Sequence, residues 1–525
     1  EHTAFADYAD DDYFRRGTYD YTTSRSSRYN FSLTANYSKV FAEKHMIYAG
    51  LNMDLEDQKS QRYSFSVEGF PSGALDFLAV AMQYKENGKP GGSESKSRRV
   101  GFVGNASYSF EDRYFVDASF RTDGSSLYGA DKRFAPFWSA GAGWNVHNEK
   151  FFKHTKISML KLRYSYGVTG NQEFSAYQAK TMFQFNTDRL YNSGISAALM
   201  GYGNPDLEWQ NQYQSNYGFD FGYAKDRIRL QFNYYQKKTE GMLTSVSVAP
   251  SLGLPSNTFT SNLGKIQNKG VEVNLNAVLI RDQGKDFEWS VMLQAAHNKN
   301  KIMEISTALK NINEKNNQDK TTPAAVYEEG ESMSAIKAVP SLGIDPTTGQ
   351  ELFMKKDGTI TYTWDATDKV ICGDSEPKVF GNVGTNLYWK GWNLNMVFKY
   401  DLGADYYNST LAERVEGANP RYNADRRVLN NRWKEPGQHA LYKNIKEYTT
   451  TYISSRFVQK ENTLQLTSLS LSYDLNREWI RKFGLNTMRL SFYMNDVFRA
   501  STVKNERGLD YPFQRSFVFG LNIGF

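Results

Sequence analysis

The sequence has no run of apolar residues long enough for a membrane-spanning helix, which needs about 20 of them. Its mean hydropathy is low, at -0.62. Cysteine occurs once, at Cys372, which excludes a disulfide framework and a metal site built from several cysteines. Proline is scarce too, with 13 residues among 525, and this favours long strands. These absences exclude a helical membrane protein and a disulfide-stapled domain.

A strong charge of either sign is also lacking. The chain carries 63 Lys and Arg against 57 Asp and Glu, so its net charge is only +6. No basic cluster dominates, and the composition gives no support to a nucleic-acid partner.

Residue groups that would support catalysis or cofactor binding are missing as well. The six histidines have no metal-ligand spacing, and the glycine-rich stretch Gly88 to Gly92 does not match a phosphate-binding loop. Asp123 to Ser126 resembles a nucleophile motif only superficially, and a tight turn would explain it. We therefore predict no enzyme, no catalytic residue, and no cofactor or metal site. Asp10 to Asp12 could help to bind Ca²⁺, although a solvated acidic loop is the simpler interpretation.

Aromatic residues, in contrast, are abundant: 35 Tyr, 34 Phe and 9 Trp make up 15% of the chain. Aromatic girdles at both membrane interfaces of an outer-membrane barrel would account for this excess. The last residues, Arg515 to Phe525, alternate with a period of two, as a tilted transmembrane strand requires. Phe519, Leu521 and Ile523 fall on one face of this strand, and Asn522 falls on the other.

The same alternation recurs along the chain and predicts an all-β protein, a transmembrane antiparallel barrel with about 15 strands in this chain. The polar faces carry mid-strand charges such as Arg121, Lys399 and Arg489, which a water-filled lumen accepts and a sandwich core rejects. We expect these three to face the lumen, and Phe398, like Leu521, to face lipid. The expected spans are 27–41, 44–58, 97–110, 112–124, 134–147, 158–169, 208–224, 227–243, 264–281, 286–303, 378–389, 391–404, 457–476, 486–498 and 513–525.

Short and long connections alternate between the expected strands. The short ones lie at Ala42–Lys44, Glu111–Asp112, Lys225–Asp226 and Lys390–Gly391. The long ones span about 59–96, 170–207, 244–262, 304–377 and 405–456. Because bacterial barrels have short periplasmic turns and long extracellular loops, we predict that the long segments face the outside.

The expected strand count is odd, because the first and last strands both run towards the periplasm. Bacterial single-chain barrels have an even number of strands, so we expect residues 1–525 to be the C-terminal part of a larger barrel. Plugged transporter barrels have about 22 strands, which would place about seven strands before Glu1. No signal peptide is visible at Glu1 either, although an outer-membrane protein needs one.

Several motifs occur in the order in which one family carries them. They are RYFVDASFRTDGSSLYGADKRFAPFWSAGAGWNV, NEKFF and LKLRYSYGVTGNQ within Asp112–Gln172, NPDLEWQ at Asn204–Gln210, NLGKIQNKGVEV at Asn262–Val273, GIDPTTG at Gly343–Gly349, GDSEPKVFGNV at Gly373–Val383 and the terminal GLNIGF. On these motifs the chain, from about Arg28 to Phe525, resembles the SusC/RagA family of TonB-dependent outer-membrane transporters of Bacteroidetes. The stretch Ala135 to Trp138 departs from the family's usual Gly-x-Phe-Pro-Ser, and we expect it to alter a girdle or loop contact.

The resemblance implies a protein of the Gram-negative outer membrane that imports a large nutrient, a glycan or an oligopeptide, with energy from TonB. It implies a SusD-like surface lipoprotein as a lid, and it allows a dimer of transporter–lipoprotein pairs. The plug and the segment that contacts the TonB complex would lie in an N-terminal part absent from this chain. A siderophore or vitamin receptor without a lid is the alternative, and a barrel enzyme or adhesin scaffold is a third interpretation that the missing catalytic set disfavours.

Contact residues can be predicted only from loop position and residue type. Aromatic and Arg side chains are favoured interface anchors, and the two longest loops carry several of each. The candidates for contact with ligand or lipoprotein are Tyr327, Trp364, Tyr406, Tyr407, Arg414 and Arg421. Membrane lipid would contact the outer wall, and Ca²⁺ in a loop or in the partner is allowed. Phe525, the terminal aromatic residue, is expected to act as the barrel assembly signal.

Overall fold

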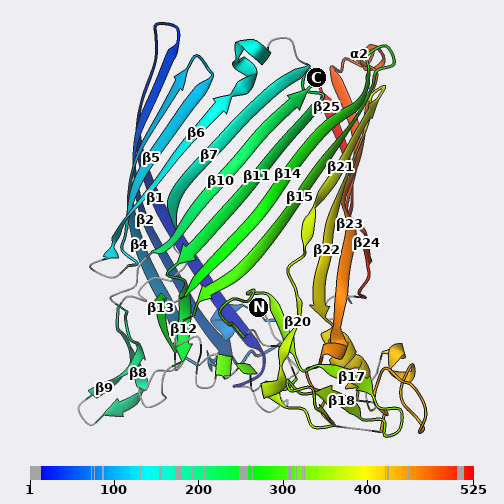
Figure 1. The fold of residues 1–525 in the computed structure, drawn as a ribbon. Coiled ribbons are helices and arrows are strands. Elements are labelled where there is room, and N and C mark those ends of the chain that lie inside the picture. The colour runs from blue at the N-terminus through cyan, green and yellow to red at the C-terminus, as the bar shows by residue number, and fades with distance from the viewer. Residues whose placement is uncertain are drawn as a thin grey trace.

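A curved antiparallel sheet, in which each long strand pairs with the next one along the chain, dominates the structure (Figure 1). The computed structural model describes residues 14–72, 74–75, 77–85, 88–128, 132–152, 156–171, 180–191, 194–204, 209–247, 258–262, 264–305, 310, 313–314, 316–317, 319–321, 323, 326–419, 421, 425–446, 449–504 and 514–525. Within this part of the chain the sheet has 16 strands, of which β3 (Gln83–Tyr84) pairs only with β2. The others follow one another in the order β1 (Thr18–Phe41), β2 (His45–Glu68), β4 (Gly91–Phe110), β5 (Tyr114–Ser125), β6 (Phe134–Asn145), β7 (Ile157–Asn171), β10 (Gln210–Tyr223), β11 (Ile228–Glu240), β14 (Lys265–Asp282), β15 (Phe287–Glu304), β21 (Val379–Trp389), β22 (Trp392–Tyr407), β23 (Val458–Asp474), β24 (Thr487–Ser501) and β25 (Phe517–Gly524).

The two ends of the sheet differ. Tight turns and the C-terminus lie at one end, and the long connections lie at the other (Figure 1). In the turn between β1 and β2, φ is 48° at Ala42 and 57° at Glu43. Two successive positive φ values characterise type I′ turns, whose twist matches that of the flanking strands. Positive φ values at Glu111, Lys225 and Lys390 mark the other short connections that the sequence predicted.

The long connections contain secondary structure that the sequence did not reveal. Their strands are β8 (Met182–Tyr191) with β9 (Gly194–Gly201), β12 (Leu243–Ser247) with β13 (Thr258–Asn262), β16 (Ala335–Ala338) with β20 (Val370–Asp374), and the three-stranded set β17 (Ser341–Ile344), β18 (Glu351–Met354) and β19 (Ile360–Thr361). Short helices are η2 (Leu78–Val80), η4 (Val146–Asn148), η5 (Lys150–Phe152), η7 (Ala366–Asp368), η8 (Thr410–Glu416), η9 (Arg426–Leu429), η10 (Ser455–Phe457) and α2 (Arg477–Arg481). None of the described helices combines the length and hydrophobicity needed to cross a bilayer.

Strand pairing separates the two faces of the sheet, because directly opposed residues share a face. Leu521 opposes Leu490, and these side chains are 57% and 46% exposed. Phe519, on the same face, is 80% exposed. Asn522 opposes Arg489 on the other face. The alternation predicted for the last strand is thus confirmed.

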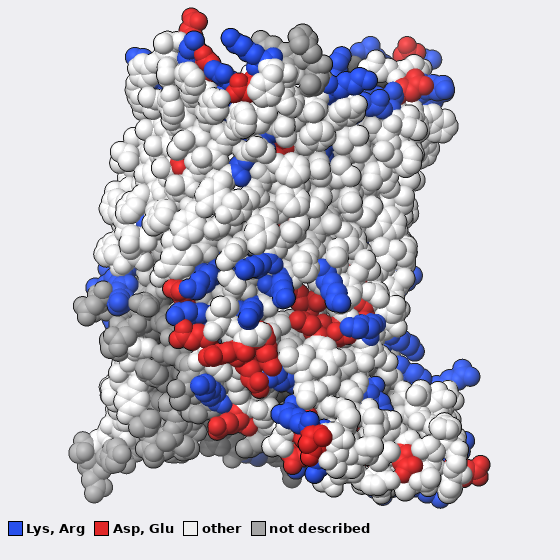
Figure 2. Space-filling view, in the orientation of Figure 1, with Lys and Arg blue, Asp and Glu red and all other residues white. Residues whose placement is uncertain are grey.

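The outer face carries a broad band with few charged side chains. Figure 2 shows this band between a charged rim at the short-turn end and a charged zone at the level where the long connections begin. Phe398 belongs to the apolar face: its ring lies 6.3 Å from that of Phe498, which is 42% exposed. Since apolar strand faces meet lipid in a membrane barrel, this band is the membrane-spanning zone.

Three strands are much longer than predicted. β1 and β2 have 24 residues each and β4 has 20, whereas about 9–11 residues suffice to cross the membrane. The expected loop at 59–96 is therefore shorter, because β2 continues to Glu68 and β4 begins at Gly91. Directly beyond the apolar band both faces of these strands are polar, as in Gln58 to Arg62, and alternation returns only at Tyr63, Phe65 and Val67.

Buried side chains are concentrated in the loops. Among the largest fully buried ones are Phe457, Ile453, Val339 and Val415, which all belong to the two longest connections. A second buried cluster lies where β5, β6 and β7 meet the connection before β10. The stable packing at the long-loop end is what positions the candidate site.

Candidate functional site

The inner face of the sheet is a wall of paired polar side chains. Arg121 Nε on β5 lies 2.5 Å from Asp123 Oδ2. Arg163 Nη2 on β7 lies 2.9 Å from Asp220 Oδ1 and also donates to Asn233 Oδ1 at 2.9 Å. Each cation has its counter-ion on the same strand or on a nearby strand. The wall is therefore polar and close to neutral, as a water-filled lumen allows.

The other two charges that the sequence assigned to the lumen are paired as well. Lys399 Nζ lies 3.0 Å from Asp401 Oδ2 on β22. Arg489 Nε lies 2.5 Å from Asp474 Oδ1 across the β23–β24 pair. Each lies on the strand face opposite to the predicted lipid-facing residues.

Residues from three of the quoted motifs meet in one aromatic cluster at the long-loop end. The Tyr128 ring stacks on Trp209 with 4.3 Å between centroids, and Phe137 meets Trp209 edge-on at 5.4 Å. Val168 and Ala135 complete the buried cluster. The motifs that identify the family in the sequence are thus packed against one another here.

A hollow of about 410 Å³ lies beside this cluster on the lumen side. Its lining includes Arg99, Arg121, Asp123, Phe137 and Trp209. The indole Nε1 of Trp209 and Oδ1 of Asp123 are both buried and have no hydrogen-bond partner among the described residues. Each of these two atoms is enclosed by protein and has almost no accessible surface, so neither is presented to the hollow.

The structure revises one expectation about these motifs and locates the stretch behind another. Asp123 to Ser125 form the end of strand β5 and are not a turn, and a side chain at Gly124 would collide with the Phe134 ring. In the departure from the family pattern, Phe137 packs inwards in the cluster while Trp138 is 45% exposed. The stretch thus contributes to internal packing at Phe137 and to the outer surface at Trp138, and its effect on a girdle or loop contact stays a prediction.

The two longest connections fold together into one unit, which we call the cap. It comprises the described residues of 305–378 and 408–457. Val339 and Ser454 form a parallel bridge, and the Ser455 amide donates to Val339 O at 2.9 Å. The indole of Trp433 donates to Pro346 O at 2.8 Å. The cap is thus one folded body at the long-loop end of the sheet, although strands β21 and β22 separate its halves in the sequence.

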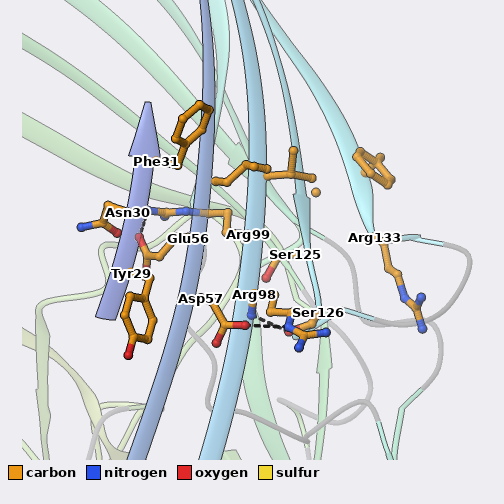
Figure 3. A pocket seen from close by; sticks show the side chains of 14 residues that line it. Tyr29, Asn30, Phe31, Glu56, Asp57, Arg98, Arg99, Ser125, Ser126 and Arg133 are labelled. Carbon is orange, nitrogen blue, oxygen red and sulfur yellow. Dashed lines mark hydrogen bonds and ion pairs between the residues drawn. The ribbon is translucent and has the colours of Figure 1, made fainter. Parts of the chain in front are cut away.

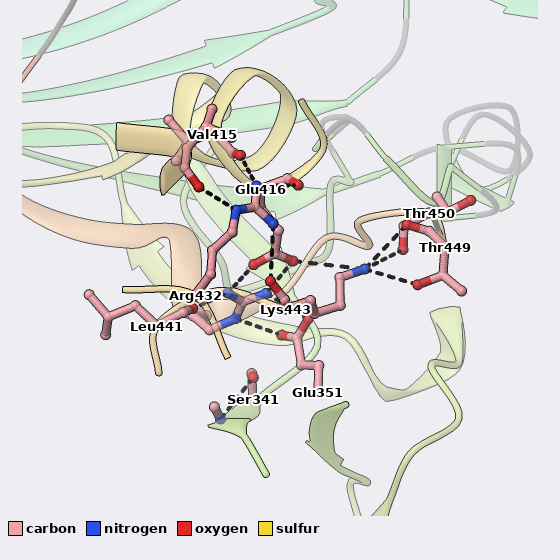
Figure 4. Close-up of polar contacts among 12 residues, drawn as sticks. Ser341, Glu351, Val415, Glu416, Arg432, Leu441, Lys443, Thr449 and Thr450 are labelled. Atoms are coloured by element: carbon pink, nitrogen blue, oxygen red, sulfur yellow. Dashed lines mark hydrogen bonds and ion pairs between the residues drawn. The ribbon is translucent and has the colours of Figure 1, made fainter. Parts of the chain in front are cut away.

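A cluster of charged side chains holds the two halves of the cap together (Figure 4). Arg456 lies 2.9 Å from Glu351 in one half and 2.7 Å from Glu416 in the other. Lys443 Nζ approaches Glu416 at 3.9 Å, and Arg432 donates to the backbone oxygen of Glu416 at 2.9 Å. The Glu416 side chain is fully buried. Burial disfavours the charge on Arg456, but its bonds to Glu416 and Glu351 outweigh this and raise its pKa.

The GIDPTTG motif makes a second junction in the cap. The Asp345 carboxylate accepts hydrogen bonds from Tyr362 OH at 2.5 Å and from the Thr347 amide at 2.8 Å. These bonds lower the pKa of Asp345 to about 2. Gly349 has φ +74° and lies against the Trp433 ring, so no side chain fits there. The motif therefore specifies a turn that packs against the other half of the cap.

The predicted contact residues divide into two groups. Trp364 stacks on Tyr452 at 5.2 Å and donates to Ile453 O at 2.9 Å. Tyr407 packs edge-on against Phe457 at 6.0 Å. Both help to hold the cap together.

The remaining candidates lie nearer the surface. Arg414 and Arg421 are exposed on the cap, and Tyr327 and Tyr406 are half-buried. Contact of any of these residues with a ligand or a lipoprotein stays a prediction. Phe525 follows the last strand and is 87% exposed, and its role in assembly also stays a prediction.

The sequence missed the residues that matter most to the cap. Glu351, Glu416 and Arg456 lie in separate stretches with no local signature, so only the tertiary fold brings them together. Trp209 could have been found, since it is the one aromatic residue of the NPDLEWQ motif. Asp10 to Asp12, considered for Ca²⁺, lie outside the described residues. In the described part of the chain no group of three or more His, Cys, Asp or Glu could hold a metal ion.

Comparison with known proteins relates this chain to TonB-dependent receptors. The family described as "TonB dependent receptor-like, beta-barrel" matches residues 2–497. TonB-dependent receptor P3 of Formosa agariphila is 27% identical over 87% of this chain and 49% of its own length. TonB-dependent receptor SusC of Bacteroides thetaiotaomicron is 23% identical over 82% of this chain and 44% of its own length.

Among solved structures, that of the RagAB peptide transporter matches with a TM-score of 0.86 and 22% identity. It covers 97% of this chain and 56% of the matched chain. The chain thus spans about half the length of the relatives that it matches.

Proposed function

Since this chain belongs to the TonB dependent receptor-like β-barrel family, we propose that the protein containing it imports a large nutrient through the outer membrane with energy from TonB. The chain is part of an outer-membrane β-barrel of a Gram-negative bacterium. The proposed nutrient is a glycan or an oligopeptide, too large for simple pores. No chemical step on the nutrient is proposed.

The observation that carries the proposal is the polar inner wall behind an apolar outer band. Arg121, Arg163 and Lys399 line this wall in ion pairs, while Phe519 and Leu521 face outwards. A solute crossing such a lumen meets hydrogen-bonding groups along its whole path. Sugars and peptide backbones are both rich in matching donors and acceptors, so the wall suits either class.

The hollow beside Trp209 supports the same proposal. Its lining includes the polar side chains of Arg99, Arg121 and Thr169. Guanidinium and hydroxyl groups can hydrogen-bond to sugars and to peptide backbones alike. The relative named as a peptide transporter, RagAB, makes peptides one class to test first.

A SusD-like lipoprotein lid is part of the proposal. The resemblance to the SusC/RagA family implies such a lid, and the cap supplies a firm base for it at the long-loop end. Arg414 and Arg421 are exposed on the cap and are of a type favoured at interfaces. Replacing both by Ala should reduce co-purification of the lipoprotein. Replacing Arg227 and Arg481, exposed near the short-turn end, should leave co-purification unchanged.

The test of energised import uses the full-length protein in its own cell. Deletion of the segment that contacts TonB should abolish growth on the cognate nutrient while barrel levels stay normal. The nutrient itself is found by mass spectrometry of ligand that co-purifies with the complex. Undiminished uptake after the deletion would replace the import proposal with passive diffusion. A complex that contains a bound siderophore and no lipoprotein would favour the lidless receptor.

A further inference from the structure

The outer wall of β1, β2, β4 and β5 has a groove of about 550 Å³ (Figure 3). One row of its lining is apolar and consists of Phe31, Leu55 and Val100, which oppose one another across the strands. Tyr29 and Phe31 are 74% and 56% exposed, so they point away from the protein. The groove therefore opens towards the surroundings of the barrel and not towards its lumen.

The groove lies at the border between the apolar band and the polar strand extensions. On one side, Leu33 and Leu51 continue the outward face at 60% and 67% exposure. On the other side the same face carries Ser27, Lys59 and Lys96, which oppose one another. In a barrel whose long loops lie outside, this border is the level of the outer-leaflet headgroups.

Positive charge is in excess at this border. Asp57 accepts from Arg98 at 2.8 Å and lies 3.6 Å from Lys96. Lys59 pairs with Glu94 at 3.5 Å. The lining of the groove itself carries three arginines, Arg98, Arg99 and Arg133, and two carboxylates, Glu56 and Asp57. Arg133, which also lines the groove, is exposed and has no ion-pair partner among the described residues.

A second hollow, of about 570 Å³, lies on the same strands nearer the middle of the apolar band. Its floor is made of small residues, among them Ala35, Ala49 and Ala106, and Leu51 and Phe120 stand at its edges. On the outward face, its first row, that of Ala35, is the second row after that of Phe31. The wall thus combines a cationic groove with an apolar hollow directly on its membrane side.

We propose that this wall binds a phosphate-bearing lipid of the outer leaflet, with its phosphate at Arg98 and Arg133 and an acyl chain in the apolar hollow. Guanidinium groups bind phosphate oxygens through paired hydrogen bonds, and Arg keeps its charge beside lipid. A hollow floored by Ala accepts a thin acyl chain, whose burial is favourable. The inference rests on the membrane orientation in the proposed function, but not on nutrient import.

Charge and shape together favour a lipid over a second protein. The arginines that line the groove lie at the headgroup level, while the hollow on its membrane side is lined mainly by apolar residues. A phosphorylated lipid has this same division between a charged head and an apolar chain. A partner protein would have to supply an acidic patch directly above an apolar ridge.

The test uses the full-length transporter, purified in detergent and mixed with diphosphorylated lipid A. Native mass spectrometry then counts the lipid molecules that each protein retains. We expect one lipid A to be retained by the natural protein. The double variant Arg98→Gln, Arg133→Gln should weaken this binding by about tenfold or more, since each cation near a lipid phosphate contributes substantially. Lipid A stripped of both phosphates should not be retained.

Two further variants separate binding from folding. Ala106→Phe fills the apolar hollow without changing any charge and should weaken retention too. Arg281→Gln is the matched control, because Arg281 is an exposed arginine paired to Glu288 at 2.8 Å near the short-turn end. It should leave retention unchanged. Heat-modifiable mobility on gels confirms that every variant is a folded barrel.

Equal retention by the natural protein and the double variant would overturn the inference. So would retention of the dephosphorylated lipid at the same level. Loss of a protein dimer in the double variant, with lipid retention unchanged, would instead identify the wall as an interface between copies. Because retention is measured on purified protein, failure of nutrient uptake in cells would not affect this outcome.

Discussion

Arg456 Nη2 lies 2.9 Å from Glu351 Oε2, although the two residues are 105 positions apart in the chain. The contact joins the connection after β15 to the connection after β22. Glu416 approaches the same guanidinium from a third stretch of chain. A single, mostly buried arginine thus links three segments of the cap.

Replacing Glu416 by Gln should loosen the cap without unfolding the barrel. The change removes the carboxylate that Arg456 and Lys443 share. Removing one partner of a buried ion pair costs about 3–5 kcal/mol of stability. Trypsin should then cut the cap faster while the heat-modifiable barrel band persists. Glu288→Gln, which breaks the exposed pair with Arg281, is the control and should not change the cutting rate. An equal rate in both variants would contradict the role given to this cluster.

The junction at Asp345 should weaken in acid. Its pKa is about 2 in the folded protein, below the ordinary value of 3.8, so the folded state binds this proton less readily. The stabilisation is therefore complete above about pH 4 and is lost as the pH falls towards about 2. Fluorine NMR of fluorotryptophan-labelled protein should show the Trp433 signal shifting in this range. In Asp345→Asn the shift should be absent, and a shift of the same size there would show that another group causes it.

Replacing Leu521 by Arg should reduce the amount of folded barrel. A charge on the lipid face costs about 2–4 kcal/mol near the membrane midplane. Asn522→Arg is the matched control, since Asn522 shares the opposite face with Arg489, which Asp474 partly neutralises. Heat-modifiable mobility of outer-membrane fractions measures both. Equal losses in the two variants would refute the assignment of faces.

Gly170→Ala should destabilise the aromatic cluster. A Cβ atom at this position would collide with the Phe137 ring, and such overpacking costs about 1–3 kcal/mol. Gly201→Ala is the control, because no atom lies within 4 Å of a Cβ there. Urea unfolding gives both midpoints. A second change, Phe137→Leu, should restore part of the loss in Gly170→Ala, and no recovery would mean that the clash is not with Phe137.

The sequence predicted the barrel strands well where they cross the apolar band. For β14 the expected span 264–281 compares with Lys265–Asp282, and for β21 the expected 378–389 compares with Val379–Trp389. In these strands one face must be apolar and the other polar, so the pattern itself carries the boundaries. The extensions of β1 and β2 were missed because a polar stretch, Gln58 to Arg62, interrupts the alternation before it returns at Tyr63, Phe65 and Val67.

The cap could not be predicted for a different reason. β16 pairs with β20 across more than 30 residues, and each strand has only four or five residues. Segments this short have no reliable periodicity of their own. Residue type pointed to Trp364, which lies in the cap, and to Tyr407, which ends β22 and packs against Phe457 of the cap. Type alone could not show that their rings face its interior.

The interlocked halves of the cap also constrain how this protein can change over generations. Arg456 pairs with a carboxylate from each half of the cap. If only one of the two segments were replaced by that of a relative, the ion pairs across the junction would lose one of their partners. The two segments, separated by strands β21 and β22, should therefore be inherited as one block. Chimeras that transplant 305–378 and 408–457 together should assemble, whereas single-loop transplants would leave mismatched charges at the junction.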